Sequence, residues 1–271
     1  MKPLYPPFYD RVRPLFTPLS TNLAVRSILN RNSIGRVYVD AQEQPHAALL
    51  WSLMDTVMIA GDPAQRELRS DLCRLLLQEL LPDARSRGIP GFTLYFDSTR
   101  WEPYLPALLP GLTPQPVRRR AFHLPQPPKI ESKALPPGAS LQRIGVDFLL
   151  FSNLINTRQV RSWVYSFWPT PADFTEQGLG FAVVKGNTVC SWCISVYAAG
   201  RELEFGVETA VAHRGRSFAT HAAAACLQEC AERDIIPHWQ CSLDNTPSLR
   251  VAEKLGFVPK RDYTAHWVPF T

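Results

Sequence analysis

Long apolar segments are missing from this sequence of 271 residues. No run of about 18 uninterrupted apolar residues occurs, which excludes a membrane-spanning helix. The first residues, MKPLYPPFYDRVRP, carry prolines and charges where a secretory signal has an apolar core, so we expect a cytoplasmic protein. A strong charge excess is missing too: 29 basic and 24 acidic residues give a net charge of +5. We therefore expect no membrane or nucleic-acid partner, whereas an anionic small molecule suits this charge.

Two common phosphate-binding motifs are absent as well. The sequence contains no P-loop of the form GxxxxGK[ST] and no dinucleotide fingerprint of the form GxGxxG. ATP and NAD are therefore poor candidates for a ligand.

Cysteine is present, but its arrangement predicts neither disulfides nor a metal site. Six cysteines in a chain without signs of export are expected to be reduced. Cys190 and Cys193 have the CxxC spacing of zinc and redox sites, yet residues 188–197 are typical of a strand. Residues three apart on a strand face opposite sides, and Cys226 and Cys230 have no second ligand pair nearby. We expect no bound metal.

Proline is abundant, with 25 residues, and it is dense in residues 125–139. Such a run forms neither a helix nor a central strand, so it predicts an extended linker. The linker separates residues 1–124 from residues 140–271, and both parts have an ordinary domain size.

Apolar periodicity predicts the same order of elements in both parts. In the front part, the pattern predicts strands at 36–40, 46–53, 56–60, 91–97 and 117–124, a helix at 62–87 and a short segment at 101–109. In the back part, it predicts helices at 147–156, 158–167, 217–233 and 246–254 and strands at 179–184, 188–197, 202–209, 238–242 and 257–268. From the first hairpin onward each part reads β-β-β-α-β-α-β, which indicates a duplicated unit and an α/β (α+β) fold.

An anion site is predicted between two elements of the back part. A strand ends near Thr209, a short loop carries Arg214 and Arg216, and a helix begins near Ser217. The first amides of a helix have no partners within it, and the helix dipole adds positive charge there. A pyrophosphate fits such a site. A helix capped by Ser217 beside two surface arginines remains an equally open interpretation.

Two sequence signatures resemble those of the GNAT N-acetyltransferase superfamily. The run from Arg214 to Ala219 resembles its [QR]-x-x-G-x-[GA] pyrophosphate loop, with Ser217 where glycine is usual. The run from Asn245 to Phe257 resembles its second signature, which ends in Gly-Phe. The pair is most similar to a bacterial two-lobed branch. That resemblance implies tandem GNAT-like lobes, each a mixed, mostly antiparallel twisted sheet flanked by helices: a degenerate lobe at 1–124 and a catalytic domain at 140–271.

The resemblance implies acetyl-CoA as co-substrate, without a metal, and an amine of a small molecule as acceptor. The thioester arm would enter between the strand ending near Thr209 and the strand at 239–242. Backbone groups of Ala210 and Val211 would pair with the pantetheine, and Asn245 and Ser248 would bond to it or order the loop. The pyrophosphate would be held by Arg214, Gly215, Arg216, Ser217, Phe218 and Ala219.

Amine attack on a thioester needs a base, an oxyanion donor and a proton for the leaving thiolate. Glu204 and Glu208 share one strand face with Glu202, which makes the first two the candidate bases. The same carboxylates could instead only solvate that face. Many members of the family carry a tyrosine where this chain has Ala252, so Tyr263, Ser242 or a water molecule remain as candidate acids.

The missing tyrosine leaves a second function open, a non-catalytic acyl-CoA-binding module. A weaker alternative is an RNA- or DNA-associated protein that uses residues 118–120. The aromatic residues after the first back-half helices either shape the acceptor pocket or pack in the core. These residues are Trp163, Tyr165, Phe167 and Trp168. The identity of the acceptor and the oligomeric state are not predicted.

Overall fold

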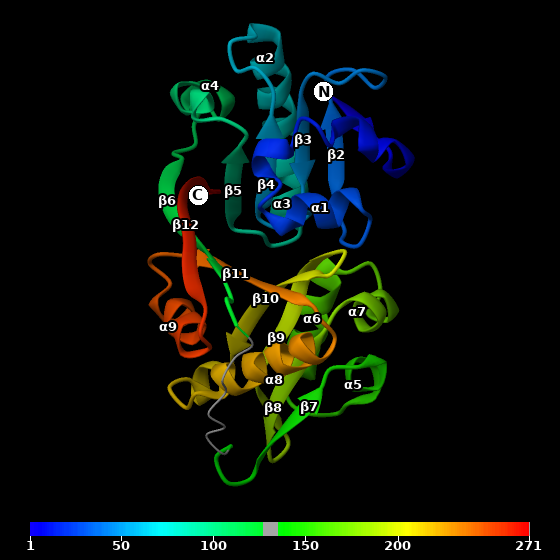
Figure 1. The fold of residues 1–271 in the computed structure, drawn as a ribbon. Coiled ribbons are helices and arrows are strands. Elements are labelled where there is room, and N and C mark those ends of the chain that lie inside the picture. Colours follow the sequence, from blue (N-terminus) through cyan, green and yellow to red (C-terminus); the bar gives the residue numbers. More distant parts are fainter. Residues whose placement is uncertain (127–134, 271) are drawn as a thin grey trace. The chain divides into compact units, whose positions relative to one another are not determined.

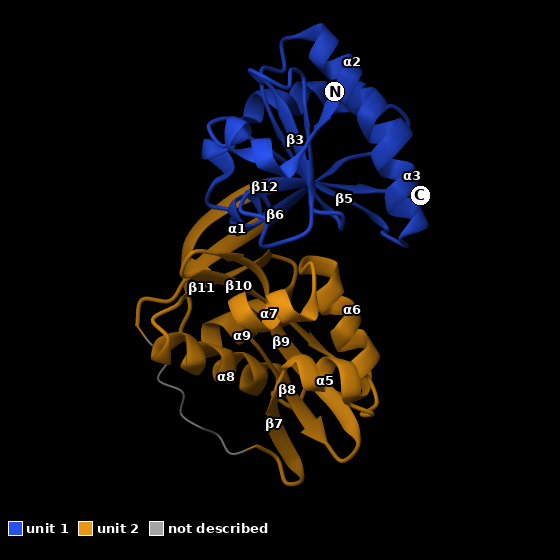
Figure 2. Cartoon of the chain, turned by 90° about the vertical axis from the view of Figure 1, so that its right-hand side faces the viewer, with its two compact units in different colours: residues 1–118, 264–271 blue, residues 119–263 orange. Residues whose placement is uncertain are grey.

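The computed structural model describes residues 1–126 and 135–270. The middle of the predicted linker, residues 127–134, lies outside the described residues. The chain divides into two compact units, residues 1–118 with 264–271 and residues 119–263 (Figure 2). We call them unit 1 and unit 2 and describe each by itself.

Unit 1 contains a mixed sheet in the strand order β1-β2-β3-β4-β5-β12. Its pairs are antiparallel apart from β4 with β5, which run parallel. Its strands are β1 (Lys2–Leu4), β2 (Arg36–Val39), β3 (Ala48–Trp51), β4 (Thr56–Ala60), β5 (Gly91–Phe96) and the end of β12 (Val258–Pro269). Its helices are α1 (Leu23–Leu29), α2 (Arg66–Leu75), a π-helical turn (Leu76–Leu80), α3 (Leu81–Ser86) and α4 (Leu105–Leu108), with 3₁₀ segments at Pro6–Val12, Thr17–Leu19 and Thr99–Tyr104.

The strands of unit 2 follow the order β6-β11-β10-β9-β8-β7 (Figure 1). Here β10 and β11 run parallel and the other neighbours run antiparallel. Its strands are β6 (Gln115–His123), β7 (Ala139–Arg143), β8 (Gly180–Lys185), β9 (Thr188–Ala199), β10 (Glu202–Thr209) and β11 (Ile236–Ser242). Its helices are α5 (Val146–Phe151), α6 (Thr157–Phe167), α7 (Pro171–Gln177), α8 (Phe218–Glu232) and α9 (Thr246–Lys254), with a 3₁₀ turn at Val211–His213.

Each half of the chain ends in a strand that completes the sheet of the other unit. Residues 266–269 of β12 pair with β5 in unit 1, and residues 119–122 of β6 pair with β11 in unit 2. The two units therefore differ at these strands from the continuous ranges 1–124 and 140–271. The division into a degenerate lobe and a catalytic lobe stays a prediction.

The core of unit 1 follows the leucine pattern of its long helix. Leu72, Leu76 and Leu80 are fully buried and pack with Trp51 and Trp101 in one cluster. Continuous helix from residue 66 to residue 86 thus matches most of the helix expected at 62–87. Burial of such side chains contributes about 1.5–3 kcal/mol each to folding.

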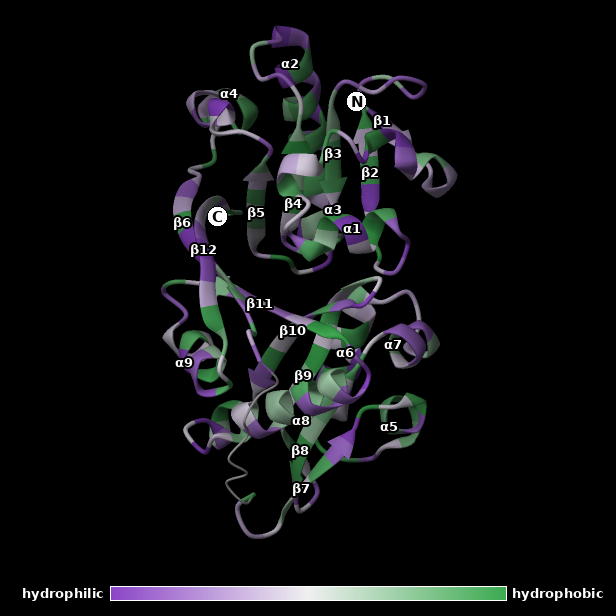
Figure 3. Cartoon of the chain, viewed as in Figure 1, coloured by the Kyte–Doolittle hydropathy of each residue, from purple (hydrophilic) through white to green (hydrophobic). Residues whose placement is uncertain are grey.

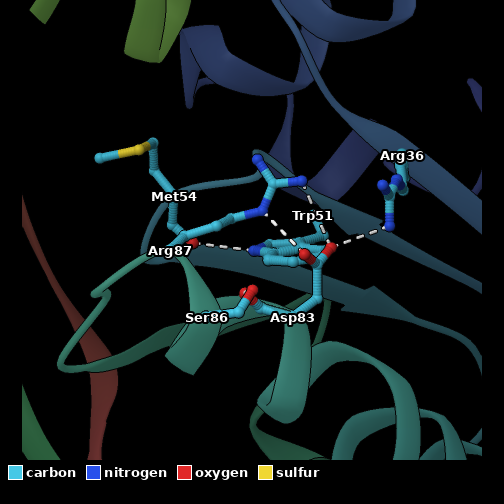
Figure 4. A network of polar contacts seen from close by, with 6 residues as sticks. All are labelled: Arg36, Trp51, Met54, Asp83, Ser86 and Arg87. Atoms are coloured by element: carbon cyan, nitrogen blue, oxygen red, sulfur yellow. Dashed lines mark hydrogen bonds and ion pairs between the residues drawn. The ribbon is translucent and has the colours of Figure 1, made fainter. Parts of the chain in front are cut away.

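A polar clamp closes the core of unit 1 at Trp51 (Figure 4). The indole Nε1 donates to the carbonyl of Met54 at 2.8 Å. The guanidinium carbons of Arg36 and Arg87 lie 5.8 and 5.9 Å from the ring centre of Trp51. Both arginines also donate to the Asp83 carboxylate, at 3.0 and 2.9 Å. One carboxylate therefore joins β2 to α3 beside a buried indole.

The sheet of unit 2 is covered by α8, which contacts β8, β9 and β10. Small alanines on α8 allow this close packing, with Ala222 and Ala223 buried. β9 is coloured hydrophobic over most of its length in Figure 3, whereas β11 is largely hydrophilic. β11 is one of the strands that line the cleft described below.

The expected strands and the helices α6, α8 and α9 are confirmed with bounds shifted by a few residues. The helix expected at 147–156 is shorter and ends at Phe151. Short elements were missed, namely β1, α1, β7 and α7. The α+β class with a mixed, mostly antiparallel sheet is confirmed.

Within the described residues, no helix has both the length and the hydropathy needed to cross a membrane.

Candidate functional site

The cleft of unit 2 begins where two parallel strands stop pairing. The register of β10 with β11 ends with Glu204 opposite His238. Beyond that pair, residues 205–209 and 239–242 line a cleft of about 870 Å³. Beyond that pair β10 and β11 are no longer in register with each other, although each stays paired on its other side with β9 or β6, and an extended ligand can pair with the edges that face the cleft.

A β-bulge lies at the same point. Glu204 lies opposite Tyr197 of β9, whereas Phe205 lies opposite Ser195, so β9 carries one extra residue. A bulge bends its strand and increases the local twist. The bulge thus accompanies the divergence of the two strands.

The loop before α8 forms one end of the cleft. Gly215 and Ser217 both have left-handed backbones, with φ values of 77° and 59°. Residues 213–220 line the cleft, so the first turn of α8 borders it. The Ser217 side chain makes no capping hydrogen bond, so the alternative in which its hydroxyl caps the helix is not observed. The first turn of α8 thus lies at the cleft, and the binding of an anion by its amides stays a prediction.

The side chain of Arg214, in the loop before α8, is hydrogen-bonded to the end of the preceding strand, β10. Its Nε donates to the Thr209 carbonyl at 3.2 Å, and its Nη2 donates to Glu208 Oε1 at 3.2 Å. The amide of Thr209 donates to the same carboxylate oxygen at 3.0 Å. Arg214 therefore shapes the loop through Glu208.

Besides Arg119 of β6, three further cations line the cleft. Arg216 belongs to the loop, and Arg250 and Lys254 belong to α9. None of the three has a hydrogen-bond or ion-pair partner within residues 1–126 and 135–270. Their charge is available to an anionic ligand.

Asn245 and Ser248 both line the cleft and order the start of α9. Asn245 Oδ1 accepts from the Ser248 amide at 3.1 Å, which makes Asn245 the N-cap. The Ser248 hydroxyl accepts from Trp239 Nε1 at 3.1 Å.

Ala210 and Val211 are not among the residues that line the cleft. The Ala210 amide donates to the Cys190 carbonyl at 2.9 Å, and Val211 is 76% exposed. The predicted cleft residues from Arg214 to Ala219 lie at the cleft together with Asn245 and Ser248, whereas these two residues lie outside its lining.

The two candidate bases have different surroundings. Glu208 lines the cleft and is held by Arg214. Glu204 is 7% exposed, and both of its oxygens lie 2.8 Å from Gln240 Nε2, which donates to them. Burial raises the pKa of the Glu204 carboxyl, and the Gln240 hydrogen bond and the Arg119 charge oppose that rise.

A line of hydrogen bonds continues from Glu204 to a second cleft residue. The Tyr263 hydroxyl donates to Gln240 Oε1, and Arg119 Nε donates to the Tyr263 oxygen at 3.4 Å. Both Gln240 and Arg119 line the cleft. Arg119 belongs to the basic run 118–120, for which the sequence suggested only a nucleic-acid contact, and Gln240 was not predicted as a site residue. Strand alternation could have placed Gln240 on the same face as His238, the register partner of Glu204.

One of the four candidate aromatic residues lines the cleft. Trp163 does so, and its ring lies 3.2 Å from where a Cβ on Gly206 would be. Tyr165 is 46% exposed, and Trp168 is buried with its Nε1 donating to the Ser195 carbonyl at 2.8 Å. Trp163 therefore forms a wall of the cleft, and Trp168 belongs to the core.

Ala252 is fully buried on α9. Among the candidate acids, Ser242 lines the cleft, and Tyr263 contacts Gln240, which lines it.

The described part of the chain contains no group of three or more His, Cys, Asp or Glu side chains that could hold a metal ion. Cys190 and Cys193 are both buried in β9.

The corresponding strands of unit 1 stay paired. β4 and β5 are in parallel register from Thr56 to Ile59. Past the end of this register, the Asp97 amide donates to the Ile59 carbonyl at 3.1 Å, and Asp97 Oδ2 accepts from the Gly61 amide at 2.9 Å. The Asp97 residue thus keeps β4 and β5 of unit 1 connected, whereas the corresponding strands of unit 2, β10 and β11, separate at this point.

A family model described as GNAT acetyltransferase matches residues 13–266, and the chain belongs to this family. It is 28% identical over 259 residues to the uncharacterized N-acetyltransferase YdfB of Bacillus subtilis (strain 168), covering 96% of this chain and 95% of that protein.

Two solved structures share the fold. The GCN5-related N-acetyltransferase-like protein from Streptococcus suis 89/1591 has a TM-score of 0.72 and 21% identity, with 96% and 98% of the two chains covered. A tandem GNAT protein from the clavulanic acid biosynthesis pathway has a TM-score of 0.60 and 14% identity, with 98% and 97% covered. The expected tandem GNAT fold is confirmed.

Proposed function

We propose that this chain transfers an acetyl group from acetyl-CoA to the amine of a small molecule, and that unit 2 carries the reaction. The supporting observation is the separation of β10 from β11 beside the loop that leads into α8. This arrangement offers backbone groups to an extended thioester arm and amides to a diphosphate at the two ends of one cleft.

The residues of the cleft fit acetyl-CoA. The first-turn amides of α8 would hold the pyrophosphate, and Arg216, Arg250 and Lys254 supply positive charge near it. In this proposal Arg214 supports the loop through Glu208, and Asn245 and Ser248 order the neighbouring start of α9. Backbone groups of residues 205–209 would replace Ala210 and Val211 as partners of the pantetheine.

The acceptor end would lie at Trp163, Gln240 and Ser242. A carboxylate takes the proton of the acceptor amine, directly or through one water, and the amine attacks the thioester carbonyl. A backbone amide of β10 stabilises the oxyanion. The indole of Trp163 supplies an apolar wall for the acceptor.

Isothermal titration with acetyl-CoA tests the coenzyme site. We expect Arg216→Glu to weaken binding about 10-fold or more, because a charge-assisted contact contributes about 1.5–3 kcal/mol. Arg158→Glu is the control, since Arg158 is exposed on α6 and is not among the cleft residues. Absence of heat with folded wild-type protein would contradict the proposal, as would unchanged affinity of the Arg216 variant.

A second candidate function is a non-catalytic acyl-CoA-binding module. The observation that favours it is the buried Ala252 on α9, at the position where many relatives have a tyrosine. Thiol release from acetyl-CoA over a panel of amines separates the two functions. Binding without thiol release on any amine would support the module, and release with one amine supports the transferase.

A further inference from the structure

Four side chains of unit 2 form one line of hydrogen bonds, in which Arg119 and Gln240 line the cleft and Glu204 is the buried end. Arg119 Nε donates to the Tyr263 oxygen at 3.4 Å, and the Tyr263 hydroxyl donates to Gln240 Oε1. Gln240 Nε2 then donates to both oxygens of Glu204 at 2.8 Å. Four strands contribute these residues: β6, β12, β11 and β10.

The direction of each bond fixes the next one. A guanidinium can only donate, so the Tyr263 oxygen accepts from Arg119. The hydroxyl proton of Tyr263 is then donated to Gln240. Gln240 Oε1 accepts this hydrogen bond, so the NH₂ group of Gln240 faces Glu204. The reverse orientation would set an amide oxygen against a carboxylate. The phenol of Tyr263 therefore selects the orientation in which Gln240 stabilises an ionised Glu204.

The groups around Glu204 come from every neighbouring strand. Tyr197 of β9 and His238 of β11 lie opposite it in register. His238 faces Glu202, with Nε2 2.6 Å from the carboxylate oxygen. Arg119 supplies positive charge, and Tyr263 is half-buried.

We propose that Gln240 and Tyr263 are positioning residues for Glu204, and that this line makes Glu204, rather than Glu208, the group that accepts the proton of the acceptor amine. The inference rests on the proposed function. Glu208 is already bound by Arg214 and by the Thr209 amide, whereas Glu204 is bound by the cleft residue Gln240 and would take the proton through one water.

The acceptor ammonium gives one proton to Glu204, and the neutral amine forms a bond to the acetyl carbon. The bond from that carbon to sulfur breaks, and the thiolate leaves with its electron pair. A second proton of the former amine passes to the sulfur, which yields the amide and free thiol. Glu204 then returns its proton to solvent.

The test follows the titration of Glu204 in the full chain by ¹³C NMR of labelled glutamate carboxyls, assigned with Glu204→Gln. We expect Tyr263→Phe to move that titration upward by on the order of one pH unit, because the carboxylate loses an oriented donor. Gln240→Leu should move it further. Tyr5→Phe, which removes a 63% exposed phenol in unit 1, is the matched control and should leave it unchanged.

Unchanged titration in both variants, with circular dichroism spectra like that of the wild type, would overturn the proposal. If Gln240→Leu does not fold, Gln240→Asn and the Tyr263 variant keep the test decisive. Titration with acetyl-CoA is measured alongside, and Tyr263→Phe should keep wild-type affinity. A failure of the proposed function then shows as lost binding in the wild type, which is distinct from a titration that does not move.

An amine that releases thiol in the panel adds a kinetic readout. The acidic limb of kcat/KM against pH should move upward with the Glu204 titration in Tyr263→Phe. A limb that stays in place while the titration moves would contradict the role of Glu204 as proton acceptor.

Discussion

Ser217 is the residue at which the loop before α8 departs from the family pattern. Its backbone has a conformation that is strained for most residues other than glycine. It has φ 59° and ψ 12°, a left-handed conformation in which glycine is unstrained. We expect Ser217→Gly to raise the free energy of unfolding by about 1 kcal/mol, measured by urea denaturation. Gly215→Ala, at φ 77°, is the opposite control and should lower it by a similar amount. A destabilised Ser217→Gly would contradict this account.

The buried carboxyl of Glu204 has a cost that depends on pH. Burial raises its pKa above the ordinary 4.5, so the folded chain holds this proton to higher pH than the unfolded chain does. Its contribution to stability is therefore intact below about 4.5 and is lost as pH rises through the folded pKa.

Glu204→Gln removes that loss. We expect the variant to match the wild type near pH 4 and to exceed its stability at pH 8, measured by thermal unfolding across pH. Acetyl transfer should be lost in the same variant. A variant less stable than the wild type at pH 8 would show that the carboxylate is favourable where it lies.

The sequence predicts site residues that lie close together along the chain, but it does not predict side-chain contacts between different strands. Glycine, arginine and the helix start at 214–219 are close in sequence, so their common place at the cleft was foreseeable. The partner of Glu204 was not, because Gln240 is 36 residues away and reaches it through strand register. The Arg214 ion pair with Glu208 spans six residues and was also missed.

At the scale of elements, the clamp around Trp51 ties β2 to α3 in unit 1. Asp83→Ala would leave the guanidinium groups of Arg36 and Arg87 without their shared carboxylate. We expect a loss of about 1–2 kcal/mol in the free energy of unfolding, measured by urea denaturation. Asp10→Ala is the matched control, because Asp10 is exposed and pairs with Arg13 at the surface, where ion pairs contribute about 0–1 kcal/mol. Equal losses in the two variants would contradict the clamp.

Elements with strong periodicity were predicted well, and short polar ones were not. The leucines of the long helix recur on one face, and burial follows that spacing. β7 has a mostly exposed side-chain pattern, so its sequence shows no apolar alternation. α7 carried a usable signal that was overlooked, since Thr170 caps it and Pro171 opens it.

At the scale of the whole molecule, the exchanged strands govern which parts can fold. A fragment of residues 140–271 lacks the β6 residues that pair with β11, and its residues 266–269 lack β5. We expect this fragment to lose acetyl-CoA binding and near-ultraviolet circular dichroism, because an edge of its sheet and an end of its last strand are unpaired. Titration of the fragment alone and mixed with residues 1–126 checks this.

Recovery of binding in the mixture would support the exchange, and full binding by the fragment alone would contradict it. The exchange could not be predicted from the sequence. Two halves with the same element order suggest two continuous domains, and apolar alternation does not say which sheet a strand joins.

The exchanged strands also determine the order in which strand pairs can form during synthesis. The free edge of β5 meets its partner only after residues 266–269 have been synthesised, later than β6 to β11. Until then the edge of β5 in the nascent chain is unpaired, and it can pair with a wrong strand. The strands β6 to β11 of unit 2 are therefore all made before the sheet of unit 1 can close, and the edge of β5 stays open throughout that interval.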